Sequence, residues 1–183
     1  MLLALTLKLW IVDFKISENS LFEFSIVNVS VMCPDPFFKS VDTVYRNSAV
    51  KIPAFHLPCH LPCVIGIQSG TGFVEVVNDG DTYADMVAEL IVSSSTTAPY
   101  VLNRTNGKKI RILNNLVAGD SVIISTVRRA KKVTVNGGRA MIDPTSVFSD
   151  FLEIGLNQID YGSDDGSDMI AASLTYTALY FGV

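Results

Sequence analysis

Short runs of β-branched and aromatic residues recur along this chain, and most are separated by residues that favour turns. Tyr100–Arg104 and Lys108–Leu113 flank Asn106-Gly107, the dipeptide most typical of a β-hairpin. Val87–Val92 and Val122–Val127 are likewise rich in β-branched residues. The alternation of apolar and polar positions therefore predicts an all-β chain.

Both ends of the chain carry longer apolar runs. The opening MLLALTLKLWIV contains Lys8 and has no small-residue cleavage site before Asp13, so we expect a first β-strand rather than a signal peptide. Met169–Phe181 is uncharged and rich in Thr, Tyr and Ala, which predicts one long strand. No run reaches the roughly 18 uncharged apolar residues of a transmembrane helix. We therefore expect a soluble chain.

One strand is expected to change face along its length. Within Leu21–Cys33 the alternation shifts by one position between Ile26 and Val27, which predicts a bulge or a sharp bend. Pro34-Asp35-Pro36 then ends the run, because proline lacks the N–H group that a sheet ladder needs.

A proline-rich stretch predicts the domain organisation. Residues 51–62 contain three prolines without helical periodicity and are interpreted as a linker. It would separate a partial, β-rich N-terminal segment, residues 1–50, from a C-terminal domain, residues 63–183. Eight or more short strands with turns at this spacing predict that the second part is an antiparallel β-sandwich or barrel.

One exception to the all-β pattern is expected. Asp143 is a suitable helix N-cap, Pro144 suits the first helical position, and the apolar residues at 147, 148, 151 and 152 have helical spacing. Gly155 could end the segment with a positive φ. We predict one or two helical turns here.

Charge is unevenly distributed along the chain. Nine of the 14 basic residues lie between Arg104 and Arg139 against one acid, Asp120, although the net charge is −4. A solvated hairpin face is the first explanation, followed by pairing with an acidic surface of the same or a neighbouring subunit. Nucleic-acid binding comes last, because no aromatic residue lies in this block to stack on bases.

The chain offers few groups for catalysis or metal binding. His56, Cys59, His60 and Cys63 are potential zinc ligands, but structural zinc sites usually draw ligand pairs from separate segments, so we interpret them as part of the linker. Both histidines lie there, which disfavours a Ser-His-Asp triad. The segment GSDDGSD, with Asp164, Asp165 and Asp168, is interpreted as a solvated loop, with calcium binding as the alternative.

We accordingly predict no catalytic, cofactor or metal site, and no enzyme. Three cysteines form an odd set in a chain that needs no disulfide at this size, which favours a reducing compartment. Apolar residues make up 49% of the chain and charged residues 17%, which excludes a disordered chain and is consistent with buried subunit interfaces.

An ordered series of short motifs resembles the C-terminal domain of the siphophage distal tail (Dit) protein family. The upstream segment Val31-Met-Cys-Pro-Asp-Pro-Phe-Phe38 is similar to the end of that family's N-terminal domain. The series consists of Asn103-Arg-Thr-Asn-Gly107, Leu116-Val-Ala-Gly-Asp120, Val135-Asn136-Gly137, Ser146-Val-Phe-Ser-Asp-Phe-Leu152 and Gly155-Leu-Asn157.

The resemblance implies a galectin-like β-sandwich jelly roll attached to a β-rich ring segment. In that family six copies form a ring between the tail tube and the baseplate or receptor-binding proteins. It therefore implies a virion structural protein of a phage or prophage tail tip, assembled in the host bacterial cytoplasm. The implied partners are copies of itself and the tail-tube, tape-measure-associated and receptor-binding or baseplate proteins, with no membrane and no sequence-specific nucleic acid.

A carbohydrate-binding module is the alternative function. Galectin-like sandwiches can hold sugars on exposed aromatic side chains, so weak glycan binding is part of this hypothesis. The only tryptophan, Trp10, lies outside the predicted sandwich. Tyr100, Tyr161, Tyr176 and Tyr180 are expected in the core or in interfaces, which favours the tail-protein hypothesis.

Overall fold

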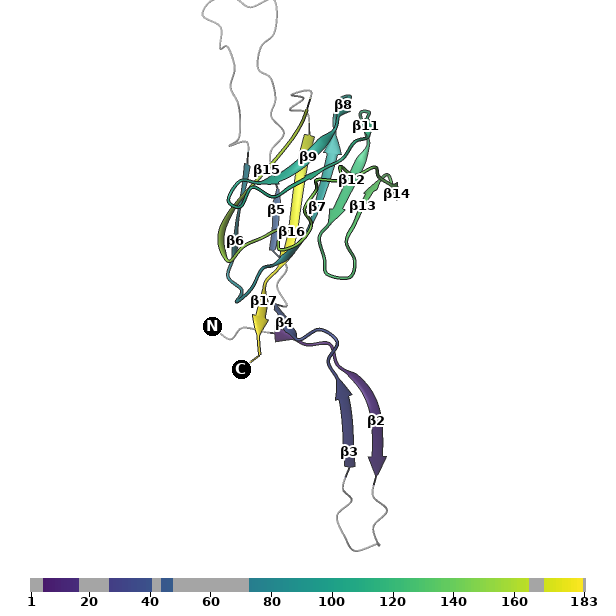
Figure 1. Cartoon of the computed structure of the whole chain (residues 1–183), viewed down its shortest axis with the longest axis vertical. Helices are drawn as coiled ribbons and strands as arrows, with labels where there is room; N and C mark the ends of the chain where they lie inside the picture. The colour runs from purple at the N-terminus through teal and green to yellow at the C-terminus, as the bar shows by residue number, and fades with distance from the viewer. Residues whose placement is uncertain (1–4, 17–26, 41–43, 48–72, 165–169, 183) are drawn as a thin grey trace, which may run out of the picture.

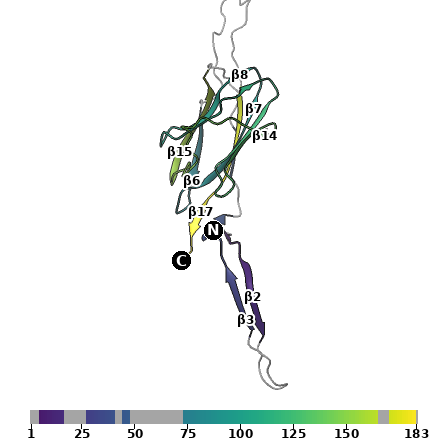
Figure 2. The same ribbon diagram turned by 45° about the vertical axis from the view of Figure 1, so that its right-hand side comes forward.

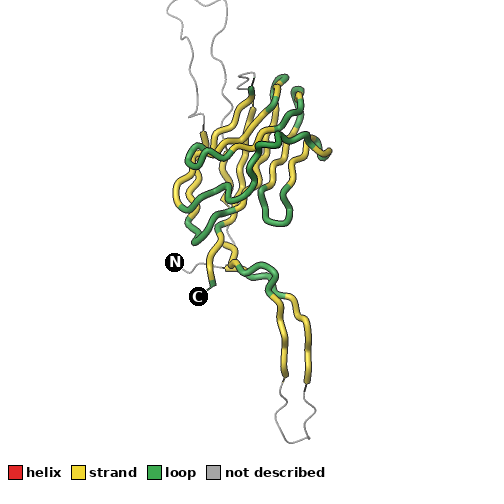
Figure 3. Tube along the Cα trace, in the orientation of Figure 1, coloured by secondary structure: helices red, strands yellow, loops and turns green. Residues whose placement is uncertain are grey.

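The computed structural model describes residues 5–16, 27–40, 44–47, 73–164 and 170–182. These residues form strands joined by loops and turns, with no helix among them (Figure 3). No helix in these ranges has the length and apolarity to cross a membrane. The strands are β1 (Leu5–Thr6), β2 (Trp10–Ile16), β3 (Val27–Met32), β4 (Phe37–Ser40), β5 (Val44–Asn47), β6 (Phe73–Asn78), β7 (Asp85–Val92), β8 (Thr96–Thr97), β9 (Pro99–Asn103), β10 (Lys109–Arg111), β11 (Asn115–Leu116), β12 (Ser121–Ser125), β13 (Lys132–Val135), β14 (Gly138–Arg139), β15 (Gly155–Ser163), β16 (Ile170–Thr177) and β17 (Leu179–Phe181).

Two antiparallel sheets form a β-sandwich. One has four strands in the order β10-β9-β15-β6, and the other has six in the order β14-β13-β12-β7-β16-β5 (Figure 1). Short ladders join β11 to β8, β2 to β3, and β1 to β4 to β17. The predicted all-β, antiparallel sandwich is confirmed.

The core lies between the two main sheets. Buried side chains alternate with partly or fully exposed ones along β7 and with partly exposed ones along β16, as expected for strands with one face against a second layer. Met86 and Leu90 are fully buried on the six-stranded side, and Val76 and Ile110 on the four-stranded side. Burying each large apolar side chain contributes about 1.5–3 kcal/mol, so this layer is the main source of stability.

Turn chemistry fixes two of the hairpins. The predicted hairpin around Asn106-Gly107 is confirmed, because β9 pairs with β10 across it and Gly107 has a φ of 72°. Asn136 and Gly137 also have positive φ values, 49° and 78°, and join β13 to β14 in a two-residue turn. The Asn-Gly signal was present there as well, but the weak alternation of Val133–Val135 gave no prediction of a hairpin.

The predicted helical turns after Asp143 are wrong. The Asp143 carboxylate accepts a hydrogen bond from the Thr145 N–H group at 2.8 Å, and Ser146 N–H donates to Asp143 O at 3.0 Å, so the chain makes one tight turn. Val147 N–H then donates to Lys109 O at 3.0 Å, outside any helix. Hydrogen bonds to another strand therefore prevailed over the helical spacing of the apolar residues. Gly155 has the predicted positive φ, 87°, but it begins β15.

The long strand predicted at Met169–Phe181 is two strands. β16 ends at Thr177 in the six-stranded sheet, and β17 begins at Leu179 and pairs with β4 instead. Ala178 lies at the change of sheet, and its carbonyl oxygen accepts a hydrogen bond from Ser40 N–H at 3.1 Å. The C-terminal strand thereby ties the N-terminal part of the chain to the sandwich.

A long hairpin, β2–β3, extends away from the sandwich beyond β4 and β17 (Figures 1 and 2). The described part of the chain opening, residues 5–16, contains the strand predicted there. The predicted linker, residues 51–62, lies outside the described residues, so the domain boundary stays a prediction. β5, which precedes it, forms the edge of the six-stranded sheet beside β16.

Candidate assembly surface

The hairpin has one continuous apolar face. Val27, Val29 and Val31 alternate along β3 and therefore point to the same side. Their partners in the ladder are Ile16, Phe14 and Ile11. Opposed residues of an antiparallel pair share a face, so six apolar side chains lie together.

A bulge in β2 makes this arrangement possible. Ile11 and Phe14 are three residues apart, so in a regular strand they would point to opposite faces. The register shifts between Ile11 and Asp13, which leaves Val12 as the extra residue. The bulge thus returns Phe14 and Ile16 to the face that carries Ile11. The bulge predicted within Leu21–Cys33 falls beside residues 17–26, which are outside the described ranges.

The other face of the hairpin carries the apolar pair Trp10–Met32 at the start of β2 and polar pairs beyond it. Lys15 pairs with Asn28, and Asp13 pairs with Ser30. The Lys15 ammonium lies 3.2 Å from the Asp13 carboxylate, and the Lys8 ammonium lies over the Trp10 ring. One face of the hairpin is therefore apolar along its whole length, and the other is polar at two of its three residue pairs.

No described part of this chain covers the apolar face. Its six side chains, Ile11, Phe14, Ile16, Val27, Val29 and Val31, are between 48% and 70% exposed. A two-stranded hairpin on its own is at best marginally stable in water. A contiguous exposed apolar surface marks an interaction site. This face, which we call the hairpin face, is the main candidate functional site.

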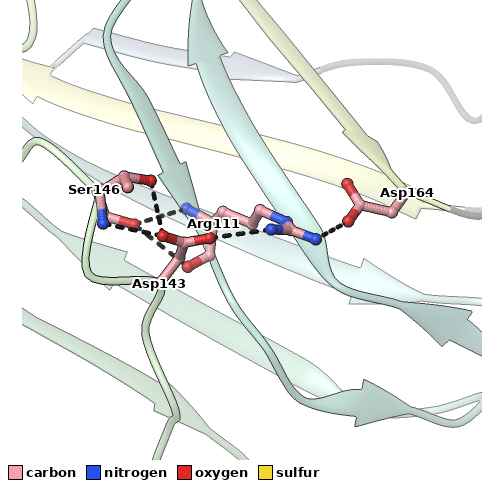
Figure 4. A network of polar contacts seen from close by, with 5 residues as sticks. Arg111, Asp143, Ser146 and Asp164 are labelled. Atoms are coloured by element: carbon pink, nitrogen blue, oxygen red, sulfur yellow. Dashed lines mark hydrogen bonds and ion pairs between the residues drawn. The ribbon is translucent and has the colours of Figure 1, made fainter.

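A second cluster of polar contacts fixes the loop that follows β14. Arg111, on β10, lies between the carboxylates of Asp143 and Asp164, with Asp143 Oδ2 2.9 Å from Nη1 (Figure 4). Arg111 N–H also donates to Ser146 Oγ at 3.0 Å. These contacts join β10, the loop and the end of β15, so the cluster is a structural clip.

Protonation of Asp143 should weaken the clip in acid. Hydrogen bonds from the Thr145 hydroxyl and N–H groups, and then Arg111, hold the pKa of the Asp143 carboxyl below its ordinary value of 3.8. A carboxyl whose pKa is lower in the folded state stabilises the fold above its unfolded pKa and loses that effect as pH falls through the folded pKa. We expect Asp143→Asn to lower the free energy of unfolding near neutral pH, and the difference from wild type to shrink below pH 3.8. Denaturant unfolding at several pH values measures this, and a pH-independent difference would contradict it.

Two buried asparagines hold the same loop from inside. Asn103 Nδ2 donates to Phe151 O at 2.7 Å and to Asn157 Oδ1 at 2.9 Å. Asn157 Nδ2 donates to Glu153 O at 2.8 Å, while its Oδ1 accepts from Glu153 N–H at 2.9 Å. Both asparagines are 0% exposed. The Asn103–Gly107 and Gly155–Asn157 motifs therefore meet in space, where their amides satisfy the backbone of an irregular buried loop.

The basic block is partly neutralised within the chain. Arg104 binds the nearly buried Asp160 carboxylate through both Nε and Nη2, at 3.1 and 2.8 Å, and Arg111 binds Asp143 and Asp164. Of the explanations offered for this block, pairing with acidic groups of the same subunit holds for these arginines and for Arg128, beside Asp85.

The residues considered as alternative metal ligands lie mostly outside the described structure. His56, Cys59, His60 and Cys63 lie outside the described residues, as do Asp165 and Asp168. Within the described ranges no group of three or more His, Cys, Asp or Glu side chains is placed to hold a metal ion. Asp164 is engaged by Arg111.

Of the four tyrosines considered as sugar-stacking residues, two are buried and two, Tyr100 and Tyr180, are half-buried. Tyr161 and Tyr176 belong to the core. Tyr100 is half-buried, with the Lys109 ammonium 3.9 Å from its ring centre and Gly162 against the ring. A Cβ atom at Gly162 would lie 2.9 Å from the Tyr100 hydroxyl. The surroundings of this ring therefore give no support to sugar stacking there.

Sequence reasoning missed the hairpin face. It predicted strands in both arms, but not that they pair with each other or leave one face uncovered. The alternation of Val27, Val29 and Val31 was visible. The register that places Phe14 opposite Val29 is set by a bulge in the other arm, so no local pattern could show it.

Comparison with known proteins agrees with the motif series. The family model for the siphovirus-type tail component, C-terminal domain, matches residues 79–180. The crystal structure of the SPP1 Dit protein is similar, with a TM-score of 0.63 and 10% sequence identity. The match covers 97% of this chain and 61% of that chain. That protein is presented as a paradigm of the hub adsorption apparatus in phages that infect Gram-positive bacteria. No curated protein sequence matches the chain.

Proposed function

The chain belongs to the family of siphovirus-type tail components, and from this premise we propose that it is an assembly hub joining the tail tube to baseplate or receptor-binding proteins. Its coarse role is that of a structural component of a phage tail, in the virion, among other tail proteins. The hub position at the tail tip, and assembly in the host cytoplasm, are the finer parts of the proposal. The division at residues 51–62 into a ring segment and a sandwich belongs to it as well.

The uncovered hairpin face is the observation that carries this proposal. Six apolar side chains on a projecting hairpin need a partner, and a second copy of the chain is always present at equal concentration. When one copy's hairpin lies against a different surface of the next copy, the contact is head-to-tail. Such contacts produce a ring when the rotation between neighbours closes.

The backbone of the hairpin offers a second means of contact. β2 pairs with β3 alone among the described strands, and β3 pairs with β2 alone, so each has an open edge. An open edge presents unpaired N–H and C=O groups that a strand from another chain can bind. Apolar burial and added strand pairing would then act together in the ring.

Such a ring suits a hub. The hairpin is at one end of each subunit and the sandwich is at the other (Figure 2). If the hairpins form the ring, the sandwiches are free to contact neighbouring tail proteins. We propose that the tail tube meets the ring and that baseplate or receptor-binding proteins meet the sandwiches.

The mass of the assembled protein tests the proposal. We expect purified full-length chain to form a closed ring of one defined size, about six copies if the family's ring is kept, seen by mass photometry and negative-stain electron microscopy. A protein that stays monomeric across the whole concentration range would contradict it. Binding to a glycan array by that monomer would favour the carbohydrate-binding alternative.

A further inference from the structure

The hairpin is joined to the sandwich by a narrow connection. β4 continues from the β3 arm and pairs with β17 through Phe37–Phe181, Phe38–Tyr180 and Lys39–Leu179. β1 lies on the other side of β4 with two residue pairs. A small sheet of such short strands can twist, so backbone pairing alone sets the hairpin angle loosely.

One arginine crosses this connection from the sandwich side. Arg128 follows β12, and its N–H group donates to Asp85 Oδ2 at 3.0 Å. Its Nη2 lies 3.4 Å from Tyr83 O, and its Nε lies 3.9 Å from Asp85 Oδ2. The guanidinium group is therefore held by groups of the sandwich.

The guanidinium group also lies over an aromatic ring of β4. Arg128 Cζ is 4.5 Å from the centre of the Phe37 ring, on β4. The Phe37 ring in turn lies against the Phe181 ring of β17, with centroids 5.7 Å apart and planes tilted by 47°. Arg128, Phe37 and Phe181 thus form a series of side-chain contacts, here called the stack, that links the sandwich, β4 and β17.

A pocket lies near this stack, next to the Asp85 side chain that Arg128 contacts. A cavity of about 110 Å³ separates the β4–β17 ladder from the end of the six-stranded sheet. Its lining includes Lys39, Asp85, Met86, Tyr176 and Leu179. Side chains do not fill this pocket, so contacts around it, such as the stack, contribute to the restraint on orientation.

We propose that Arg128 is a positioning residue that fixes the angle of the hairpin relative to the sandwich, through its stack on Phe37. The inference concerns the same surface as the proposed ring and deepens that function. A head-to-tail contact closes into a ring only if the angle between copies is constant. A loose hairpin would give open or mixed assemblies, so the stack would control ring closure.

The orientation of the hairpin can be measured directly. One spin label is attached at Ser30→Cys, on the face of β3 opposite the hairpin face, and one at Ala118→Cys, in the sandwich. Pulsed electron paramagnetic resonance then measures the distance between the two labels. Cys33, Cys59 and Cys63 are first replaced by serine, and labelled chain is diluted with unlabelled chain so that each pair lies within one subunit. We expect one narrow distance distribution in the otherwise wild-type chain.

Arg128→Ala should broaden that distribution. Loss of a solvent-accessible cation–π contact should lower the population of the wild-type hairpin orientation, relative to all other orientations, by roughly two- to fivefold. Phe37→Leu keeps an apolar side chain but removes the ring face, so it should broaden the distribution in the same way. Arg128→Lys should restore part of the narrow distribution, because an ammonium can lie over the ring but lacks the planar fork.

The exposed neighbour Arg129 supplies the matched control, since Arg129→Ala removes the same charge from the same loop. We expect it to leave the distribution unchanged, and all variants to keep the unfolding temperature of the sandwich, whose core excludes Arg128. An unchanged distribution in both Arg128→Ala and Phe37→Leu would overturn the proposal. Equal broadening by Arg129→Ala would overturn it too, because net charge would then explain the effect.

The measurement separates this inference from the proposed ring. If the chain never assembles, the distance distribution still tests the stack within single subunits. If the ring forms, mass photometry adds a second readout, and Arg128→Ala should give several assembly sizes where Arg129→Ala gives one. A single ring of wild-type size in Arg128→Ala would contradict the control of closure.

Discussion

Replacing Val29 with aspartate is expected to abolish assembly of the chain while leaving its sandwich folded. Val29 lies in the middle of the hairpin face, opposite Phe14. A carboxylate there would be buried without a partner whenever a neighbouring copy covers the face. Leaving a charge unpaired in an interface costs about 2–5 kcal/mol, which weakens each contact more than tenfold.

The control for this substitution carries the same charge on the other face. Asn28→Asp places a carboxylate next in sequence but opposite Lys15, so it should leave assembly intact. Mass photometry compares the three proteins, and thermal unfolding confirms that the sandwich is unchanged. Normal assembly of Val29→Asp would show that the hairpin face is not buried between copies.

Replacing Asn157 with alanine is expected to give a large loss of stability. Its amide satisfies the Glu153 N–H group and the carbonyl oxygens of Glu153 and Gly155, and it accepts a hydrogen bond from Asn103. Alanine would leave these buried backbone groups without partners and would open a cavity. We expect a loss of about 2–4 kcal/mol in the free energy of unfolding.

An exposed asparagine provides the comparison. Asn115→Ala changes the same residue type on β11, where the side chain is exposed, and should change stability by less than about 0.5 kcal/mol. Urea unfolding followed by fluorescence measures both variants. Equal effects at the two sites would mean that the amide network around Asn157 does not support the loop.

Local chemistry explains which parts of the fold were predictable. The Asn106-Gly107 hairpin was predicted because a two-residue signal favours positive φ whatever the rest of the chain does. The same signal at Asn136-Gly137 led to no predicted hairpin, because apolar and polar positions alternate only weakly in the residues around it. The turn at Asp143 was misread as helical because spacing alone cannot show that Val147 bonds to Lys109.

The missed features all depend on contacts distant in sequence. The division of the C-terminal run at Ala178 depends on β4, and the hairpin face depends on a bulge in β2. Arg111 meets Asp143 and Asp164 only after three segments come together. The order of the motifs still identified the family, because it reflects the whole chain and no single motif is specific.

In the proposed hub, the sandwich and the hairpin have different tasks. The sandwich has a filled core and internal ion pairs, so it can keep its shape while it contacts other proteins. Among the described residues the hairpin has an uncovered apolar face and open strand edges, which the proposed ring would cover. This division fits a hub that is rigid in its outer parts and closed by its hairpins.

A cryo-electron microscopy structure of the assembled wild-type chain would show directly whether the hairpin face is buried between copies. We expect a closed ring in which Phe14, Val29 and the other side chains of the hairpin face are buried against the neighbouring copy. A ring held together by the sandwich sheets, with the hairpin face still in solvent, would contradict it.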